Sequence, residues 1–355
     1  MVGAYTHVFD DAESYAAALR PAAVQITVTQ PGQFAASLTD LDLGRVSLRR
    51  CEEIVARVAH VELPPGKAVF TFLAGAGHGV FFAGSELQRN AIVRHAAGRD
   101  YYQRTMGRAP LASISLPLDD LASLPGMPEF DAAPPPVSVT VLPSAHAMQR
   151  LLRLHEVATG MVANAPEVLR QQGAVHGLEH ALIGALQDCL VGASIVYDSA
   201  GQHGHEAIMR RFAGALDASS GLTMFLPEMC AAIGVSARTL RACCHEHLGM
   251  GPKHFLMLRS MNLVRHALLA ADCQVSSVTE LATEFGFWEL GRFAVTYRDL
   301  YGEAPSATLR RDSVPSAARC STSAGRNARV RPWVPARGEP TGHAPSRGLS
   351  LASAS

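Results

Sequence analysis

Long apolar runs are missing from this chain of 355 residues. The closest approach to one, residues 68–84, is interrupted by Thr71, His78 and four glycines. A transmembrane helix needs about 20 mostly apolar residues, so the sequence predicts no membrane span. The first residues also lack a basic stretch followed by an apolar core, which argues against a secretory signal. We therefore expect a cytoplasmic protein.

Cysteine is sparse, and its seven positions follow no pattern. Their number is odd and no Cys-x-x-Cys pair occurs, so we expect reduced thiols. Two segments look like metal sites, the H-x-x-E-H motif at His176–His180 and the cluster at Cys243–His247. Gly177 weakens a helix in the first, and only Cys243 and His247 share a helical face in the second. The sequence predicts no metal, no cofactor and no catalytic residue.

The formal net charge is zero, but the two signs are distributed unevenly. Lys and Arg number 14 against 20 Asp and Glu in residues 1–207, 11 against 9 in residues 208–311, and 6 against 2 in residues 312–355. A chain that is acidic at the front and basic at the back favours a C-terminal part that faces nucleic acid.

The first part of the chain has the pattern of short strands. Residues 24–29 alternate and are β-branched, residues 45–61 contain several such stretches, and residues 67–73 are apolar and aromatic. Gly and Pro separate these stretches, and the Gly-rich segment 75–79 is expected to form a hairpin turn. Several short strands separated by turns predict a small antiparallel barrel or sandwich.

Helical periodicity follows a proline-rich connector, Pro125–Pro143. Leucines at helical spacing predict two helices between about residues 144 and 191. Polar, Gly-containing residues then predict a linker over residues 192–207. Ser, Pro, Gly and Ala make up 25 of the 44 residues in 312–355, so we expect a disordered basic tail there.

Residues 226–247 have the pattern of a helix-turn-helix unit. We expect a short helix over Leu226–Ile233, which Gly234 ends. Ser236 is a good N-cap for a second helix over Ala237–His247. A helix, a tight turn with glycine and a second helix form the helix-turn-helix motif.

The same pattern recurs 52 residues later. A helix over Val278–Phe285 leads to Gly286 and then to a helix over Trp288–Leu300, with a turn one residue longer than the first. Between the two units, Pro252–Ala271 is expected to form a helix of about 30 Å. Successive major grooves on one face of DNA lie about 34 Å apart, so two units joined by such a helix favour DNA binding.

Residues 208–311 resemble the DNA-binding domain of the AraC/XylS family of bacterial transcription regulators. The matching stretches are GVSARTLRACCHEHLGMGPKHFL (234–256), RSMNLVRHALLAAD (259–272) and VTELATEFGFWELGRFAVTYRDLYGEAPSATLRR (278–311). The chain resembles the subgroup whose N-terminal half is a cupin-like sensor domain followed by dimerising helices. The chain departs from the family where an arginine is usual, at Ala242, Ser260 and Val295.

The resemblance implies an α+β protein with an N-terminal β-rich, cupin-like domain and a C-terminal all-α domain containing two helix-turn-helix units. We expect a sensor and dimerisation domain at 1–191, a linker at 192–207, the DNA-binding domain at 208–311 and the tail at 312–355. The implied partners are double-stranded DNA, a second copy of the chain, a small-molecule effector and RNA polymerase, as for an activator. The residues implied to contact DNA are Ser236, Arg238, Thr239, Arg241, Trp288, Glu289, Leu290, Gly291 and Arg292.

Two alternatives come from other classes of protein. A cupin-type enzyme fused to a DNA-binding domain would need two or three histidines and a carboxylate converging inside the barrel. The β-rich region offers His60, His78 and His95, with no close His-x-His pair. A protein-interaction module would have helical pairs that never touch DNA.

Overall fold

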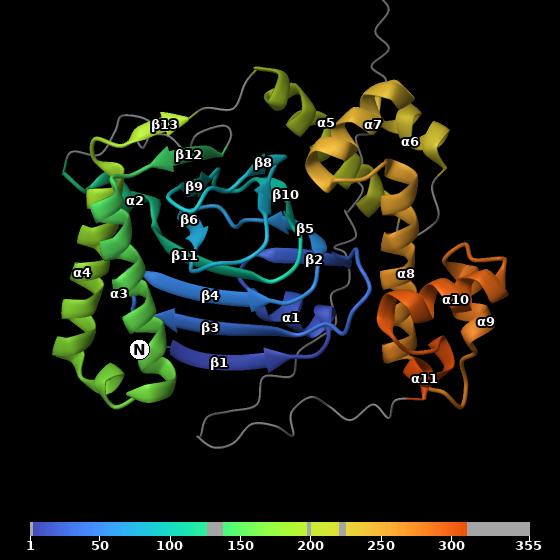
Figure 1. Ribbon diagram of the computed structural model, residues 1–355, viewed down its shortest axis with the longest axis horizontal. Coiled ribbons are helices and arrows are strands. Elements are labelled where there is room, and N and C mark those ends of the chain that lie inside the picture. Colours follow the sequence, from blue (N-terminus) through green and yellow to red (C-terminus); the bar gives the residue numbers. More distant parts are fainter. Residues whose placement is uncertain (1–2, 126–137, 197–199, 220–224, 311–355) are drawn as a thin grey trace, which may run out of the picture. The chain divides into compact units, whose positions relative to one another are not determined.

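The computed structural model describes residues 3–125, 138–196, 200–219 and 225–310 (Figure 1). The described residues, all of which lie within 1–313, belong to one compact unit. Among the described helices, none is long and apolar enough to cross a membrane. The tail predicted at 312–355 lies outside the described residues.

Two antiparallel sheets build the N-terminal part of the chain. The larger sheet has eight strands in the order β1–β3–β4–β11–β6–β9–β12–β13. The smaller has five in the order β2–β5–β10–β7–β8. The larger sheet consists of β1 (Gly3–Phe9), β3 (Ala36–Asp42), β4 (Ser47–Glu53), β6 (Lys67–Leu73), β9 (Ile92–His95), β11 (Ala109–Pro117), β12 (Val139–Leu142) and β13 (Ser194–Val196). The smaller consists of β2 (Ala23–Val28), β5 (Arg57–Glu62), β7 (Val80–Phe82), β8 (Ser85–Glu86) and β10 (Asp100–Thr105).

The largest core lies between the larger sheet and two long helices. Alternation along β6 buries Ala68, Phe70 and Phe72. The helices α3 (Ala145–Asn164) and α4 (Gln172–Leu190) pack side by side and place Leu151, Leu182 and other apolar side chains in the same cluster (Figure 1). Three short elements complete this part: α1 (Ala12–Ala18), α2 (Leu118–Ala122) and η2 (Val168–Arg170). The β-rich fold and the two predicted helices are confirmed.

Three segments differ from the expectation. The end of the proline-rich connector forms β12, because β9 and β13 supply hydrogen-bond partners on both sides. Residues 192–207, predicted to be a linker, contain β13 and the start of α5 (Ala200–Ala218). The Gly-rich segment 75–79 is not a hairpin turn, since it connects β6 in one sheet to β7 in the other. A Cβ at Gly77 would lie 2.7 Å from the carbonyl oxygen of Arg108, so glycine there permits the close crossing.

The C-terminal part of the chain is all-α, as predicted. The long helix α8 runs from Pro252 to Ala270, close to the expected bounds. The domain boundaries expected from the sequence, after residues 191, 207 and 311, stay predictions. The remaining helices are α6 (Leu226–Ile233), α7 (Ala237–Leu248), α9 (Val278–Glu284), α10 (Leu290–Tyr301) and α11 (Pro305–Leu309).

Helix α8 covers the open edge of the smaller sheet. Asn262, only 6% exposed, accepts a hydrogen bond from the Val28 backbone N–H at 3.2 Å. Its amide nitrogen donates to the carbonyl oxygens of Val28 at 3.5 Å and of Leu258 at 2.8 Å. Because β2 is an edge strand, the side chain of Asn262 takes the place that a further strand would occupy.

Replacing Asn262 with leucine is expected to lower the free energy of unfolding by about 1–3 kcal/mol, because the buried N–H of Val28 loses its partner. The midpoint of urea denaturation would measure this loss. His266→Leu is the matched control, since His266 is exposed on the same helix and its replacement should change stability by no more than about 0.5 kcal/mol. Equal losses in the two variants would contradict the role given to Asn262.

Candidate DNA-binding surface

The first helix-turn-helix unit consists of α6 and α7. Helix α6 ends at Gly234, which adopts a left-handed conformation with φ 69° and ψ 39° that suits glycine. The N–H of Val235 then donates to the carbonyl oxygen of Cys230 at 3.1 Å. Ser236 caps α7 by accepting a hydrogen bond from the N–H of Thr239 at 3.1 Å. The turn therefore forms as the sequence predicts.

Helix α7 buries one face and exposes the other. Leu240, Cys243 and Cys244 are fully buried against α5 and α6. Arg238 and Arg241 are exposed, and as residues three apart they lie on one face of the helix. The first two turns of α7 thus present two guanidinium groups to solvent.

The second unit, α9 and α10, repeats the geometry of the first. The N–H of Phe287 donates to the carbonyl oxygen of Ala282 at 2.9 Å, as Val235 does to Cys230 in the first unit. Gly286 has φ 85°, in the left-handed region. Ser277 and Glu280 form a capping box at the start of α9. The internal repeat seen in the sequence is therefore also a repeat of backbone hydrogen bonds.

The start of α10 differs from the prediction. The helix begins at Leu290 instead of Trp288, because the turn after Gly286 continues to Glu289, the N-cap. Trp288 is 78% exposed, and Gly291 and Arg292 are exposed beside it. Leu290 is half-buried.

Arg292 forms an exposed ion pair with Glu289, with Nη1 2.9 Å from Oε2. Such a pair contributes little to stability, so the Arg292 guanidinium can exchange this partner for a phosphate at small cost. At the positions predicted to contact DNA, the second unit thus presents one cation, one large aromatic ring and one carboxylate to solvent.

Helix α8 joins the two units and packs on both. Phe255 near its start belongs to the cluster around α7, whereas Val264 and Leu268 belong to the cluster around α9 and α10. The Arg265 guanidinium donates to Glu303 at 2.9 Å, and the same carboxylate oxygen accepts from Thr308 at 2.9 Å. Because both ends of α8 are anchored, the helix sets a fixed separation of about 28 Å along its axis.

A change at the first cap should show how much α7 depends on Ser236. Ser236→Ala removes the acceptor of the Thr239 N–H and is expected to lower the free energy of unfolding by about 1 kcal/mol. Thermal unfolding would measure the shift in Tm. Ser236→Asn keeps an acceptor and should stay near the wild type, so equal shifts in both variants would argue against a capping role.

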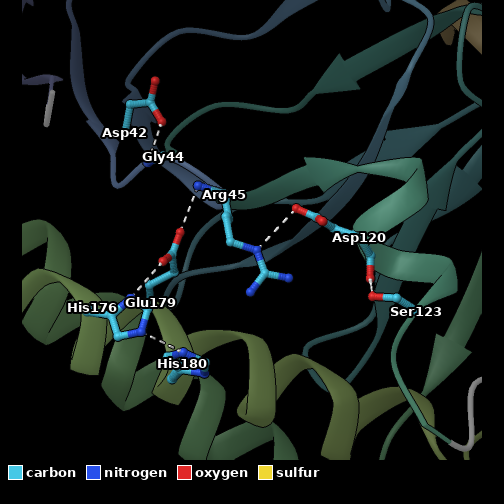
Figure 2. Close-up of polar contacts among 8 residues, drawn as sticks. All are labelled: Asp42, Gly44, Arg45, Asp120, Ser123, His176, Glu179 and His180. Carbon is cyan, nitrogen blue, oxygen red and sulfur yellow. Dashed lines mark hydrogen bonds and ion pairs between the residues drawn. The ribbon is translucent and has the colours of Figure 1, made fainter.

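The H-x-x-E-H motif does not have the geometry of a zinc peptidase (Figure 2). Glu179 is buried, and its Oε1 accepts from the Arg45 backbone N–H at 2.7 Å. Its other oxygen lies 3.7 Å from His176 Nδ1, and the two Nε2 atoms of His176 and His180 are 3.1 Å apart. A peptidase needs this glutamate free to act as a base on a metal-bound water, whereas here it holds the loop at Gly44 and Arg45.

Two other candidate metal clusters have explanations in packing. Burial raises the pKa of the Cys244 thiol to about 12, so this group is a neutral packing residue. In the β-rich region His95 is buried, is hydrogen-bonded to Thr71 and has its pKa lowered by burial to about 3, while His78 is exposed. Within the described residues, His60, His78 and His95 do not form the convergent set that a cupin enzyme needs.

Comparisons with known proteins concern mainly the helical part. A family model described as "Helix-turn-helix domain" matches residues 229–311. The XylDLEGF operon transcriptional activator 1 of Pseudomonas putida is 42% identical over 77 residues, which are 22% of this chain and 23% of that protein. The probable thc operon regulatory protein of Rhodococcus erythropolis is 30% identical over 136 residues, which are 35% of this chain and 40% of that protein. The matched segment spans less than a quarter of the P. putida activator and less than half of the R. erythropolis protein.

Among solved structures, the AraC-like transcriptional activator CuxR is similar, with a TM-score of 0.38 and 15% identity over 78% of this chain and 98% of that one. The paired helices and the family match define the C-terminal part as a helix-turn-helix domain of the DNA-binding type. The relatives that match this part by sequence are regulators of transcription, so residues 229–311 are similar to the helix-turn-helix domain of AraC/XylS-type regulators.

Proposed function

We propose that this protein is a sequence-specific DNA-binding regulator of transcription whose two helix-turn-helix units contact two successive major grooves. The observation that carries the proposal is the turn repeated in the two units on either side of α8, each turn followed by a helix with exposed polar and charged residues. The helix between them is about 28 Å long, near the ~34 Å that separates major grooves on one face of DNA.

The contacting residues of the first unit have distinct roles in this proposal. Arg238 and Arg241 bind guanine through O6 and N7, the commonest specific contact made by arginine. Ser236 caps the start of α7, and its hydroxyl is hydrogen-bonded to the Thr239 hydroxyl at 2.9 Å. We assign the hydroxyl groups of Ser236 and Thr239 to phosphate contacts.

In the second unit, Trp288 and Leu290 provide apolar contact to thymine methyl groups, and Gly291 lets the backbone approach the duplex. Arg292 binds phosphate, and Glu289 accepts from cytosine N4. We expect the first unit to contribute more of the specificity, because it has two cations that can reach base edges.

The N-terminal part, residues 1–191, is proposed to sense a small-molecule effector and to hold two copies of the chain together. A signal there would change how the two DNA-binding domains are held on DNA. The relatives in P. putida are named as transcriptional activators, so we propose activation through RNA polymerase, in the cytoplasm and without enzymatic activity.

Selection of binding sites from random duplexes, followed by footprinting, tests the two-groove proposal. One chain should protect two segments about one helical turn apart, 10–10.5 base pairs centre to centre. Insertion of half a turn between the segments should abolish specific binding, because α8 is anchored at both ends and cannot rotate one unit relative to the other. A minimal site confined to one groove would overturn the proposal.

A further inference from the structure

A polar cluster lies where the smaller sheet meets α5. His60 and Glu62 are two residues apart on β5, so both side chains point to the same face of the sheet. On that face, Gln25 of the neighbouring β2 donates to Asp217 Oδ1 of α5 at 3.2 Å. His60, Glu62 and Asp217 each offer one ligand atom, and these atoms all lie within 4.8 Å of one another. The contact region formed by His60, Glu62, Gln25 and Asp217, called the seam below, brings together residues from distant parts of the sequence.

The spacing of these atoms fits a single metal ion. Nitrogen and carboxylate ligands lie about 2.0–2.2 Å from ions such as Zn²⁺, so two ligands of one ion can be at most about 4.4 Å apart. Side-chain movements of a fraction of an ångström would bring the three atoms into that range. One imidazole and two carboxylates favour borderline divalent ions such as Zn²⁺ or Co²⁺ over Mg²⁺ and Ca²⁺, which prefer all-oxygen ligands.

The charges at the seam also favour a cation. Glu62 and Asp217 bring two negative groups close together, and neither makes an ion pair with a lysine or arginine in the described part of the chain. Arg210 is already paired with Asp100 at 3.3 Å. Arg259 also lines the seam and interacts electrostatically with Asp217, although not at ion-pair distance, so it offsets part of the negative charge. A bound divalent ion would remove the repulsion between the two carboxylates.

A further carboxylate holds the imidazole in place. His60 Nε2 lies 3.0 Å from Asp100 Oδ2, and Asp100 also pairs with Arg210. In the proposed site the ring proton is assigned to Nε2, which donates to this carboxylate. The other ring nitrogen then keeps the lone pair that a metal ion needs, and a carboxylate behind a ligating histidine is the usual support of such a site.

We propose that His60, Glu62 and Asp217 bind one divalent transition-metal ion of the Zn²⁺ class. The ion joins β5 to the last turn of α5. Helix α5 in turn packs on α6 and α7, with Phe212 in the core of the first helix-turn-helix unit. The ion therefore fastens this unit to the smaller sheet.

Calorimetric titration of ZnCl₂ into the metal-stripped full chain tests the proposal without DNA. We expect one equivalent of Zn²⁺ to bind per chain and, at about 100 times the Kd, to raise Tm by about 5 °C. Asp217→Asn keeps the oxygen that accepts from Gln25 but removes the charge, and it should weaken binding at least about 10-fold. Glu62→Gln, at an exposed position that leaves folding intact, should do the same.

The control is the double variant His176→Gln/His180→Gln, which removes the other pair of imidazoles that converge in the described structure. It should bind Zn²⁺ as the wild type does. Wild-type affinity in both Asp217→Asn and Glu62→Gln would overturn the proposal. Loss of binding in the control alone would also overturn it, and would place the ion on α4.

Discussion

Replacing Glu53 with alanine is expected to lower the free energy of unfolding by about 3–5 kcal/mol. The Glu53 carboxylate is 1% exposed and binds the Arg57 guanidinium through both oxygens, at 2.7 and 2.8 Å. It also accepts from the Tyr15 hydroxyl at 2.9 Å. Without it, the buried guanidinium of Arg57 keeps, among the residues that the structure describes, a single hydrogen-bond acceptor, the carbonyl oxygen of Gln103 at 3.3 Å. Chemical denaturation of the full chain would measure the loss.

Two further variants separate the cost of an unpaired charge from the cost of lost packing. Glu53→Gln keeps the shape of the side chain and one acceptor, so its stability should fall between those of the wild type and Glu53→Ala. The double variant Glu53→Leu/Arg57→Met replaces the pair with apolar groups and should be closer to the wild type than Glu53→Ala is. A double variant as unstable as Glu53→Ala would show that the unpaired guanidinium is not the cause.

Replacing Arg238 or Arg241 with alanine is expected to weaken binding to a selected operator by about 1–3 kcal/mol, and to relax the preference at one base position. Each arginine is exposed on the first turns of α7, so its removal should leave the fold unchanged. The measurement is the affinity for the operator and for each of its single-base variants at fixed salt.

Arg292→Ala is the comparison within the second unit. Since Arg292 is assigned to phosphate, this variant should weaken binding evenly across sequences and reduce the slope of affinity against salt. Equal losses for the operator and for scrambled DNA in Arg238→Ala and Arg241→Ala would mean that these arginines contact only phosphate. Base recognition would then have to lie in the second unit.

The sequence predicts those elements whose signals are local. Strand β6 has its predicted bounds, because alternating apolar and aromatic residues mark a strand with one buried face. Strand β1 has no such signal, since nearly all of its residues are exposed, and its strand conformation depends on pairing with β3. Strand β12 also depends on pairing, with β9 and β13. The proline-rich composition around it gives no strand signal, and both partner strands are distant in the sequence.

The same distinction holds for the sites. The helix-turn-helix residues follow from the sequence because a glycine, a cap and the helix after it lie within a few residues of one another. The cluster of His60, Glu62 and Asp217 could not be predicted, since α5 brings Asp217 to β5 from more than 150 residues away. The opposite case is His176–His180, whose spacing in the sequence resembles a catalytic motif. In the structure, Glu179 accepts a hydrogen bond from the backbone of Arg45 instead.

The hydrogen bonds of Asn262 have a consequence for dissecting this protein. A fragment that ends at residue 191 contains β2 but lacks α8, so the backbone of Val28 loses the amide that covers it. Such a fragment would present an open strand edge that can pair with the same edge of another molecule. Pairing of the isolated N-terminal fragment through this edge, as distinct from the dimer proposed for the full chain, would then be an artefact of truncation, and it should diminish when residues 192–310 are restored.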